Sequence, residues 1–329
     1  MDDYVRAGEP IVQPERPSDA AGAIARCVLY EGCNVGPYGR HAPKHQPSRT
    51  PSGVYPAGYA SAGHPDNPCA MRTECLIEAD DALDLTISVR FLHVVDRRIL
   101  KGDDASFVNT LTVRGVGYAT GQDAREREIT VRLPDVDLHD DLRYELPVVI
   151  EPGTTCEPLA DDTGYLAGWI TRSWEALEAS IVARIVPVAN GVARISVAVR
   201  NHSIWGGGSH DVTQRRTLVA AHTVLHSPTG RFVSLNDPPA SLGEAVAACR
   251  NVGTWPVLVG TPPARDTMLS SPIIFYDYPQ VPSEGHGDFG ETAGRSFRAR
   301  DGLGQTAPGP LDARAEGSTS DRASQSELT

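Results

Sequence analysis

The sequence predicts a mainly β protein, an antiparallel, β-sandwich-like single domain with two short helices and a disordered C-terminal tail. Three observations predict this class. Apolar and polar residues alternate over residues 83–95, apolar segments flank the Asn190-Gly191 dipeptide, and helical periodicity is confined to two short segments. Period-two alternation is typical of strands with one buried and one solvated face, which favours antiparallel sheets. The scarcity of helices between the strands argues against a parallel β-α-β fold.

Three regimes of composition divide the chain. Residues 1–22 are polar and contain prolines, which predicts a flexible leader. Residues 23–281 hold nearly all the apolar periodicity and predict the β-rich domain, with an irregular Pro-, Gly-, Ser- and His-rich loop at about 34–68. Residues 282–329 carry few apolar side chains. Because such a segment buries too little apolar surface to offset its ordering entropy, a disordered tail is predicted there.

The clearest strand covers residues 83–95, where apolar side chains such as Leu85, Ile87 and Phe91 occupy alternate positions. His93 falls on the same apolar face, so it is interpreted as a core histidine with one hydrogen-bonded nitrogen. Further strands are predicted at 107–116 and 128–133.

Residues 180–200 predict a β-hairpin whose register depends on its loop. A two-residue turn would pair apolar with polar side chains, whereas a three-residue loop pairs Ile185 with Ile195 and keeps one face apolar. We therefore expect a three-residue loop with Gly191 in the left-handed conformation. Pro187 has no N–H for a ladder, which favours a position near a sheet edge.

The remaining predicted elements are a second hairpin and two helices. The hairpin joins strands at 218–226 and 231–235 through a Ser-Pro-Thr-Gly turn at 227–230. A helix is predicted at 241–248, where an S-x-x-E capping box follows two prolines. A shorter helix is predicted at 170–178.

Charge and targeting signals exclude several classes of protein. The 30 Lys+Arg against 42 Asp+Glu give a formal net charge of −12, which argues against a nucleic-acid partner. Neither a signal peptide nor a membrane span is predicted, so a cytoplasmic location is expected. The 6 cysteines are too few for a disulfide scaffold in so long a chain, and their spacing fits no zinc ribbon.

Candidate chemistry is sparse. The sequence contains no phosphate loop, hydrolase elbow or metalloprotease motif, so no catalytic residue and no cofactor is predicted. An alternative is a metal-dependent enzyme that uses His202, His210, Asp211 and His222, because the first two histidines bracket a flexible Gly-rich loop. No fixed spacing requires such a site.

Aromatic residues and prolines gather in residues 251–280. Trp255, Phe275, Tyr276 and Tyr278 are therefore predicted as a partner-binding face, since Trp and Tyr are common interface anchors. The alternative is a twisted final strand whose aromatic side chains cover the end of the core. A β-sandwich that binds a small ligand or carbohydrate is a further possibility, suggested by fold class alone.

Several strings, in their order along the chain, resemble an uncharacterised bacterial protein family encoded in [NiFe]-hydrogenase gene clusters. They are Arg26-Cys27-Val28-Leu29-Tyr30-Glu31-Gly32, Gly53-Val54-Tyr55-Pro56, Met71-Arg72-Thr73-Glu74, Val89-Arg90-Phe91-Leu92-His93, Ser234-Leu235-Asn236-Asp237-Pro238-Pro239, Cys249-Arg250-Asn251 through Trp255-Pro256-Val257-Leu258-Val259-Gly260, and Leu269-Ser270-Ser271-Pro272-Ile273-Ile274 to Pro279. The resemblance covers about residues 23–281. It implies a cytoplasmic, non-catalytic accessory or assembly protein that contacts hydrogenase subunits or maturation proteins, with hydrogenase genes beside its own.

The chain departs from that family in two segments, 33–52 and 282–329. Both are also segments with little apolar periodicity. Our hypothesis is that they are degenerate or locally out of frame, and resequencing of the gene tests it.

Overall fold

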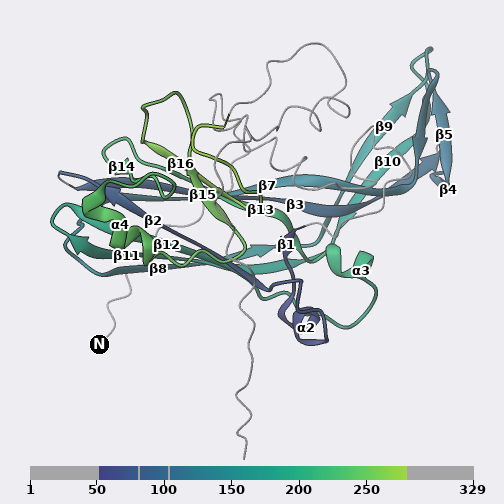
Figure 1. Ribbon diagram of the computed structural model, residues 1–329. Helices are drawn as coiled ribbons and strands as arrows, with labels where there is room; N and C mark the ends of the chain where they lie inside the picture. Colours follow the sequence, from purple (N-terminus) through teal and green to yellow (C-terminus); the bar gives the residue numbers. More distant parts are fainter. Residues whose placement is uncertain (1–51, 81, 103, 280–329) are drawn as a thin grey trace, which may run out of the picture.

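The computed structural model describes residues 52–80, 82–102 and 104–279 (Figure 1). The predicted leader, the first part of the 34–68 loop and the predicted tail therefore lie outside the described residues. The described chain is mainly β with antiparallel pairing throughout its sheets, which confirms the predicted fold class. None of its helices has the length and apolar character needed to cross a membrane.

The larger sheet has nine strands in the order β15-β16-β13-β3-β10-β9, with β1 paired to β13, and β4 and β7 paired to β3. Its strands are β1 (Gly53–Val54), β3 (Leu83–Lys101), β4 (Ser106–Val108), β7 (Gly121–Val136), β9 (Gly153–Ala160), β10 (Leu166–Trp174), β13 (Leu218–His226), β15 (Trp255–Leu258) and β16 (Thr267–Ser271). In Figure 1, β3, β7 and β13 form the upper layer of the molecule.

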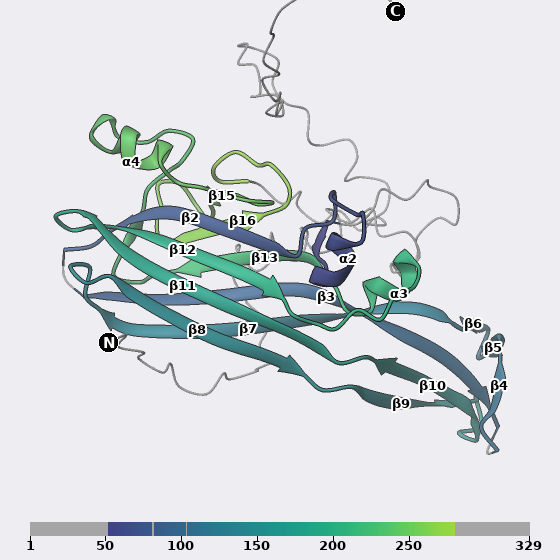
Figure 2. The ribbon, with the colours of Figure 1, turned by 90° about the horizontal axis from the view of Figure 1, so that it is seen from below.

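The second sheet has five strands in the order β14-β2-β12-β11-β8 and forms the lower layer. Its strands are β2 (Ala70–Glu78), β8 (Leu142–Ile150), β11 (Leu177–Ala189), β12 (Val192–Asn201) and β14 (Arg231–Phe232). A two-stranded sheet pairs β5 (Thr110–Val113) with β6 (Val116–Ala119). The helices are α2 (Ala57–Ser61), α3 (His210–Gln214) and α4 (Gly243–Ala247), the last preceded by a 3₁₀ turn at Ala240–Leu242. Figure 2 shows β9, β10 and β4–β6 extending beyond the end of the second sheet.

The main hydrophobic core lies between the two layers. Alternate residues of β3, among them Leu85, Ile87 and Phe91, pack in one cluster with Ile181 and Ile195 from the opposite sheet. This confirms the period-two interpretation, although β3 continues to Lys101 and is buried at every position from 89 to 95. The predicted strand at 128–133 is the inner part of the longer β7, and the one at 107–116 divides into β4, β5 and the start of β6.

The register predicted for the 180–200 hairpin is confirmed, since Ile185 pairs with Ile195. Its cause differs from the prediction. The turn has two residues, because Ala189 pairs with Val192, and a bulge between Pro187 and Ala189 supplies the extra residue. Gly191 has φ +67°, as expected. Strand β11 is internal rather than at an edge, but Pro187 lies beyond its last pair with β8, where no ladder hydrogen bond is lost on that side.

Two sequence predictions are wrong: one in the strand with which β14 pairs, the other in the secondary structure of residues 170–178. Strand β13 covers 218–226 as predicted, but the chain then crosses to the other sheet, where β14 pairs with β2 instead of β13. The segment 170–178 is not a helix, because residues 170–174 belong to β10 and residues 177–178 to β11. Its helical spacing of apolar residues is overridden by ladders to β3 and β9.

The helix predicted at 241–248 is shorter, since α4 covers 243–247; Leu242 of the 3₁₀ turn and Val246 of α4 are buried. No side-chain hydrogen bond caps it or the preceding 3₁₀ turn, so the predicted capping box does not form. The described part of the 34–68 loop is more ordered than predicted, since it contains β1 and α2 and buries Tyr55 and Tyr59.

Candidate functional site

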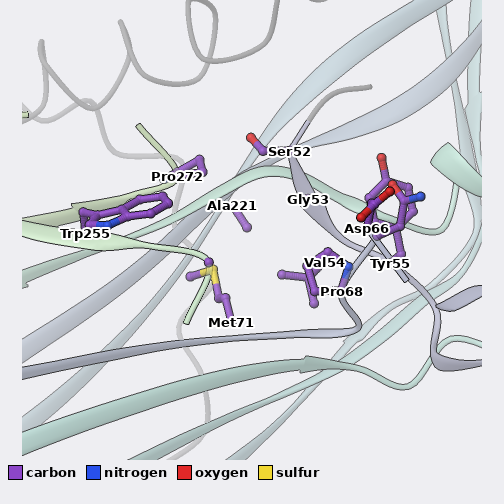
Figure 3. Close-up of a pocket in the computed structure, with 12 residues that line it drawn as sticks. Ser52, Gly53, Val54, Tyr55, Asp66, Pro68, Met71, Ala221, Trp255 and Pro272 are labelled. Carbon is purple, nitrogen blue, oxygen red and sulfur yellow. The ribbon is translucent and has the colours of Figure 1, made fainter. Parts of the chain in front are cut away.

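A pocket of about 420 Å³ opens beside Trp255 (Figure 3). Trp255 and Pro272 lie on one side of it and Val54 and Pro68 on the other. Asp66, at the end of the pocket away from Trp255, is the one carboxylate among the described residues that line it. The pocket therefore combines apolar side chains with a polar end, as binding sites do.

Strand β1 forms one wall. Gly53 and Val54 pair with Val219 and Leu218 of β13. A Cβ at position 53 would lie 2.9 Å from the Thr217 Cγ2 atom, so only glycine allows this close approach. The Tyr55 N–H donates to the Pro68 carbonyl at 2.8 Å, which ties the two segments of this wall together.

The base of the pocket is formed by the buried side chains of Met71 and Ala221. Beyond Met71 along β2, the Thr73 hydroxyl donates to Ser270 Oγ at 2.8 Å, and Ser270 Oγ lies 2.7 Å from Thr254 Oγ1. All three hydroxyl residues are buried. This chain of hydrogen bonds joins β2 to β16 and to the residue that precedes Trp255, so it holds the base and the rim in a fixed relation.

The rim is formed by Trp255, whose side chain is 44% exposed. It lies on β15, the strand at one end of the larger sheet. The outer edge of β15 is blocked, because the Leu258 N–H donates to Asp277 Oδ1 at 2.8 Å and its carbonyl accepts from the Tyr278 N–H at 2.7 Å. Pro256 has no N–H to offer. A partner must therefore use side-chain contacts here rather than add a strand.

The other predicted contact residues differ in their surroundings. Tyr276 is 80% exposed and free to meet a partner. Phe275 is half-buried and packs on a small cluster formed by Val257, Val259 and Leu269. Tyr278 packs against the main core, and its hydroxyl donates to the Ala264 carbonyl at 3.0 Å. The structure thus gives Phe275 and Tyr278 packing roles, while contact of Trp255 and Tyr276 with a partner stays a prediction.

The residues of the alternative metal site do not form a ligand cluster. His202 Nε2 lies 2.7 Å from Ser180 Oγ, whereas His210 contacts the Tyr59 hydroxyl and Gln214. His222 is buried in β13, and Asp211 is exposed in α3. Over the described ranges, no three His, Cys, Asp or Glu side chains are placed to hold a metal ion. The metal hypothesis therefore lacks its ligands there.

Two of the strings that carry the family resemblance meet beside this site. Glu74 Oε2 accepts from the Arg250 N–H at 2.6 Å, and the Glu74 N–H donates to Asn251 Oδ1 at 2.7 Å. The Asn251 side chain also donates to the Glu74 carbonyl at 3.1 Å. These bonds anchor the segment that leads into Trp255 onto β2. The string that contains Glu74 and the string that contains Arg250 and Asn251 therefore pack together as one unit.

Replacement of Asn201 by Ala is expected to lower the free energy of unfolding by about 2–3 kcal/mol. Asn201 is buried at the end of β12 and donates to the Val54 and Arg216 carbonyls at 2.8 and 2.7 Å, while its Oδ1 accepts from the Ser203 N–H. The variant leaves these backbone groups without their partner and loosens the β1 wall. Urea unfolding measures the change. The exposed Asn236→Ala variant is the control, and equal losses in both variants would contradict the assignment.

The fold and the site together define an antiparallel β protein of two main sheets, with a pocket beside the edge strand β15. Comparison with known proteins finds no matching protein-family model and no matching curated protein.

Proposed function

We propose that this protein is a non-catalytic accessory or assembly protein that binds a partner through the pocket beside Trp255. The observation that carries the proposal is the half-exposed indole of Trp255 at the rim of a pocket that combines apolar and polar side chains. Tryptophan is among the residues that contribute most to binding when a partner covers them. The resemblance of the sequence suggests that the partner belongs to a [NiFe]-hydrogenase system, either a hydrogenase subunit or a maturation protein.

The pocket suggests what the partner presents. Its volume of about 420 Å³ suits one or two large side chains or a small ligand. Met71, Val54 and Pro272 favour an apolar side chain, and Asp66 at the opposite end favours a hydrogen-bond donor or a basic group. We therefore expect a partner segment in which an apolar residue lies close to a Lys or Arg.

Removal of the two exposed aromatic side chains, in the Trp255→Ala/Tyr276→Ala variant, is expected to weaken partner binding by about 30-fold or more. Binding of the tagged full chain to purified [NiFe]-hydrogenase subunits and maturation proteins measures this. Tyr165→Ala is the matched control, because Tyr165 is 74% exposed in the β9–β10 turn, away from the pocket. A double variant that binds as tightly as the control would refute the proposed surface.

A small-ligand or carbohydrate-binding function is the second candidate. It is favoured by one observation, an aromatic ring facing a pocket that also contains Asp66 and Asn67, since sugars combine an apolar face with many hydroxyl groups. A thermal-shift screen of mono- and disaccharides separates the two candidates. A saturable shift that Trp255→Ala abolishes would favour this second function over partner binding.

A further inference from the structure

A second group of side chains lies outside the pocket. We call it the arginine cluster: Arg125 and Arg127 of β7, Trp174 of β10 and His93 of β3. His93 pairs with Arg125 and Phe91 with Arg127 in the β3–β7 ladder. Because directly paired residues share a face of the sheet, both arginines lie on the core-facing side, just beyond the last core residues. Their guanidinium carbons lie 4.9 and 5.1 Å from the Trp174 ring centroid.

The positive charge of this cluster is not balanced by its neighbours. In the described chain neither Arg125 nor Arg127 forms an ion pair, although two like charges are brought over one ring. Asp123, on the same face, is engaged by Arg97 and Arg172. Burial, and then the charge of Arg125, lower the pKa of Arg127 to about 10, so it remains cationic at neutral pH. An anion bound here would relieve this repulsion.

Arg127 presents the edge that recognises oxyanions. Its Nε and Nη2 atoms are buried and have no hydrogen-bond partner among the described residues. These two nitrogens direct parallel N–H bonds along one edge of the guanidinium, the geometry with which arginine binds two oxygens at once. The contact with Trp174 is made through the ring and occupies neither nitrogen with a hydrogen bond. Arg125, beside it on the same ring, is exposed.

His93 adds an acceptor. Its side chain is fully buried, and its Nε2 lies 3.1 Å from the Arg215 carbonyl oxygen. A carbonyl can only accept, so Nε2 carries the hydrogen. Burial, and then the charge of Arg127, lower the pKa of His93 to about 4, so the ring is neutral and Nδ1 holds a lone pair. The Nδ1 atom is buried without a partner in the described residues.

We propose that the arginine cluster binds a protonated phosphate group, with two phosphate oxygens on Arg127 Nε and Nη2 and the P–OH group donating to His93 Nδ1. Hydrogen phosphate matches both parts of the cluster because it is an anion that still carries a donor at neutral pH. Carboxylate and sulfate have no proton to give at this pH and leave His93 Nδ1 unpaired. The inference is independent of the pocket beside Trp255.

Isothermal titration calorimetry of the full chain in a phosphate-free buffer tests the site. We expect saturable binding of inorganic phosphate and binding of sulfate that is at least about tenfold weaker at equal ionic strength. Arg127→Gln should weaken phosphate binding by at least about tenfold. The matched control is Arg132→Gln, which removes an exposed arginine from the same strand and should leave binding unchanged. No saturable phosphate binding, or equal affinity for sulfate, would overturn the proposal.

Two further variants keep the test valid if Arg127→Gln does not fold. Arg127→Lys retains the charge but loses the paired N–H edge, and it should also bind phosphate more weakly. His93→Phe keeps a ring and removes the acceptor, so the preference for phosphate over sulfate should disappear. Unchanged discrimination in a folded His93→Phe variant would refute the role of His93.

Titration with phosphoserine at pH 6 distinguishes the source of the phosphate group. Binding as tight as that of inorganic phosphate assigns a phosphorylated partner, and loss of binding assigns free phosphate.

Discussion

Acidification from pH 7 to pH 4 is expected to lower the free energy of unfolding by about 3 kcal/mol for each of two buried histidines, His93 and His222. Burial lowers the pKa of each to about 4 in the folded chain, from an ordinary value of 6.5. The positive charges of Arg127 and Arg90 add to the lowering at His93 and His222 respectively. Both side chains are fully buried, so protonation in the folded state would place a charge in a site that already repels it.

The direction of the effect follows from which state binds the proton first. Because the folded pKa lies below the unfolded one, the unfolded chain takes up protons as the pH falls below about 6.5, while the folded chain does so only near 4. The stabilisation is therefore complete above pH 6.5, is lost progressively between 6.5 and 4, and changes no further through these groups below 4. Asp141 acts in a lower window, because its hydrogen bond to Arg184 holds the pKa of its carboxyl below the ordinary 3.8.

Urea unfolding at a series of pH values in phosphate-free buffer measures this dependence. The His93→Gln/His222→Gln variant should show a much flatter curve between pH 6.5 and 4, whatever its stability at pH 7. The single variants divide the effect between the two sites. A wild-type curve that is flat over this window would contradict the assignment of two neutral, buried rings.

Replacement of Phe91 by Ala is expected to lower the free energy of unfolding by about 3–5 kcal/mol. Phe91 is 0% exposed on β3 and packs in the main cluster with residues from both sheets. The strands around it are held by long ladders, so they cannot collapse into the space that the ring leaves. The cost therefore includes a cavity as well as the lost transfer of the ring from water.

The control for this variant is Phe107→Ala, which truncates a phenylalanine that is 57% exposed on β4. Its effect should stay within about 0.5 kcal/mol. Chemical denaturation of both variants at pH 7.5 makes the comparison. Similar losses at the two positions would mean that β3 is not the central strand of the packed core.

Local patterns predicted those parts of the fold in which neighbours along the chain determine burial. The alternation over residues 83–95 marked β3, and the requirement that Ile185 face Ile195 set the β11–β12 register, although a bulge rather than a longer loop produces it. The segment 170–178 shows the limit of this reasoning. Its apolar spacing suits a helix as well as two strands, and the neighbours that decide in favour of strands are distant in sequence.

Some residues of the candidate site could likewise be predicted from the sequence, and others could not. Trp255 and Tyr276 were found from their aromatic, proline-rich surroundings, because a concentration of residue types is visible in a single segment. The β1 wall, Met71, Ala221 and Asp66 carry no comparable signal, since they come from separate strands and loops that meet only in the fold. The arginine cluster was missed for the same reason: His93, Arg125 and Trp174 lie on three strands.

By itself, the sequence determined the class of this protein: an antiparallel β fold of acidic charge, with a long half-buried strand and an aromatic segment at residues 251–280. Periodicity, composition and turn residues act over short stretches of chain, so they are readable without a structure. Only the tertiary structure decided that β14 crosses to the second sheet, that Trp255 borders a pocket and that the Arg127 guanidinium lies over the Trp174 ring. Those features depend on contacts between residues far apart in the chain, whose free energy is set by packing and by desolvated charge rather than by local preference.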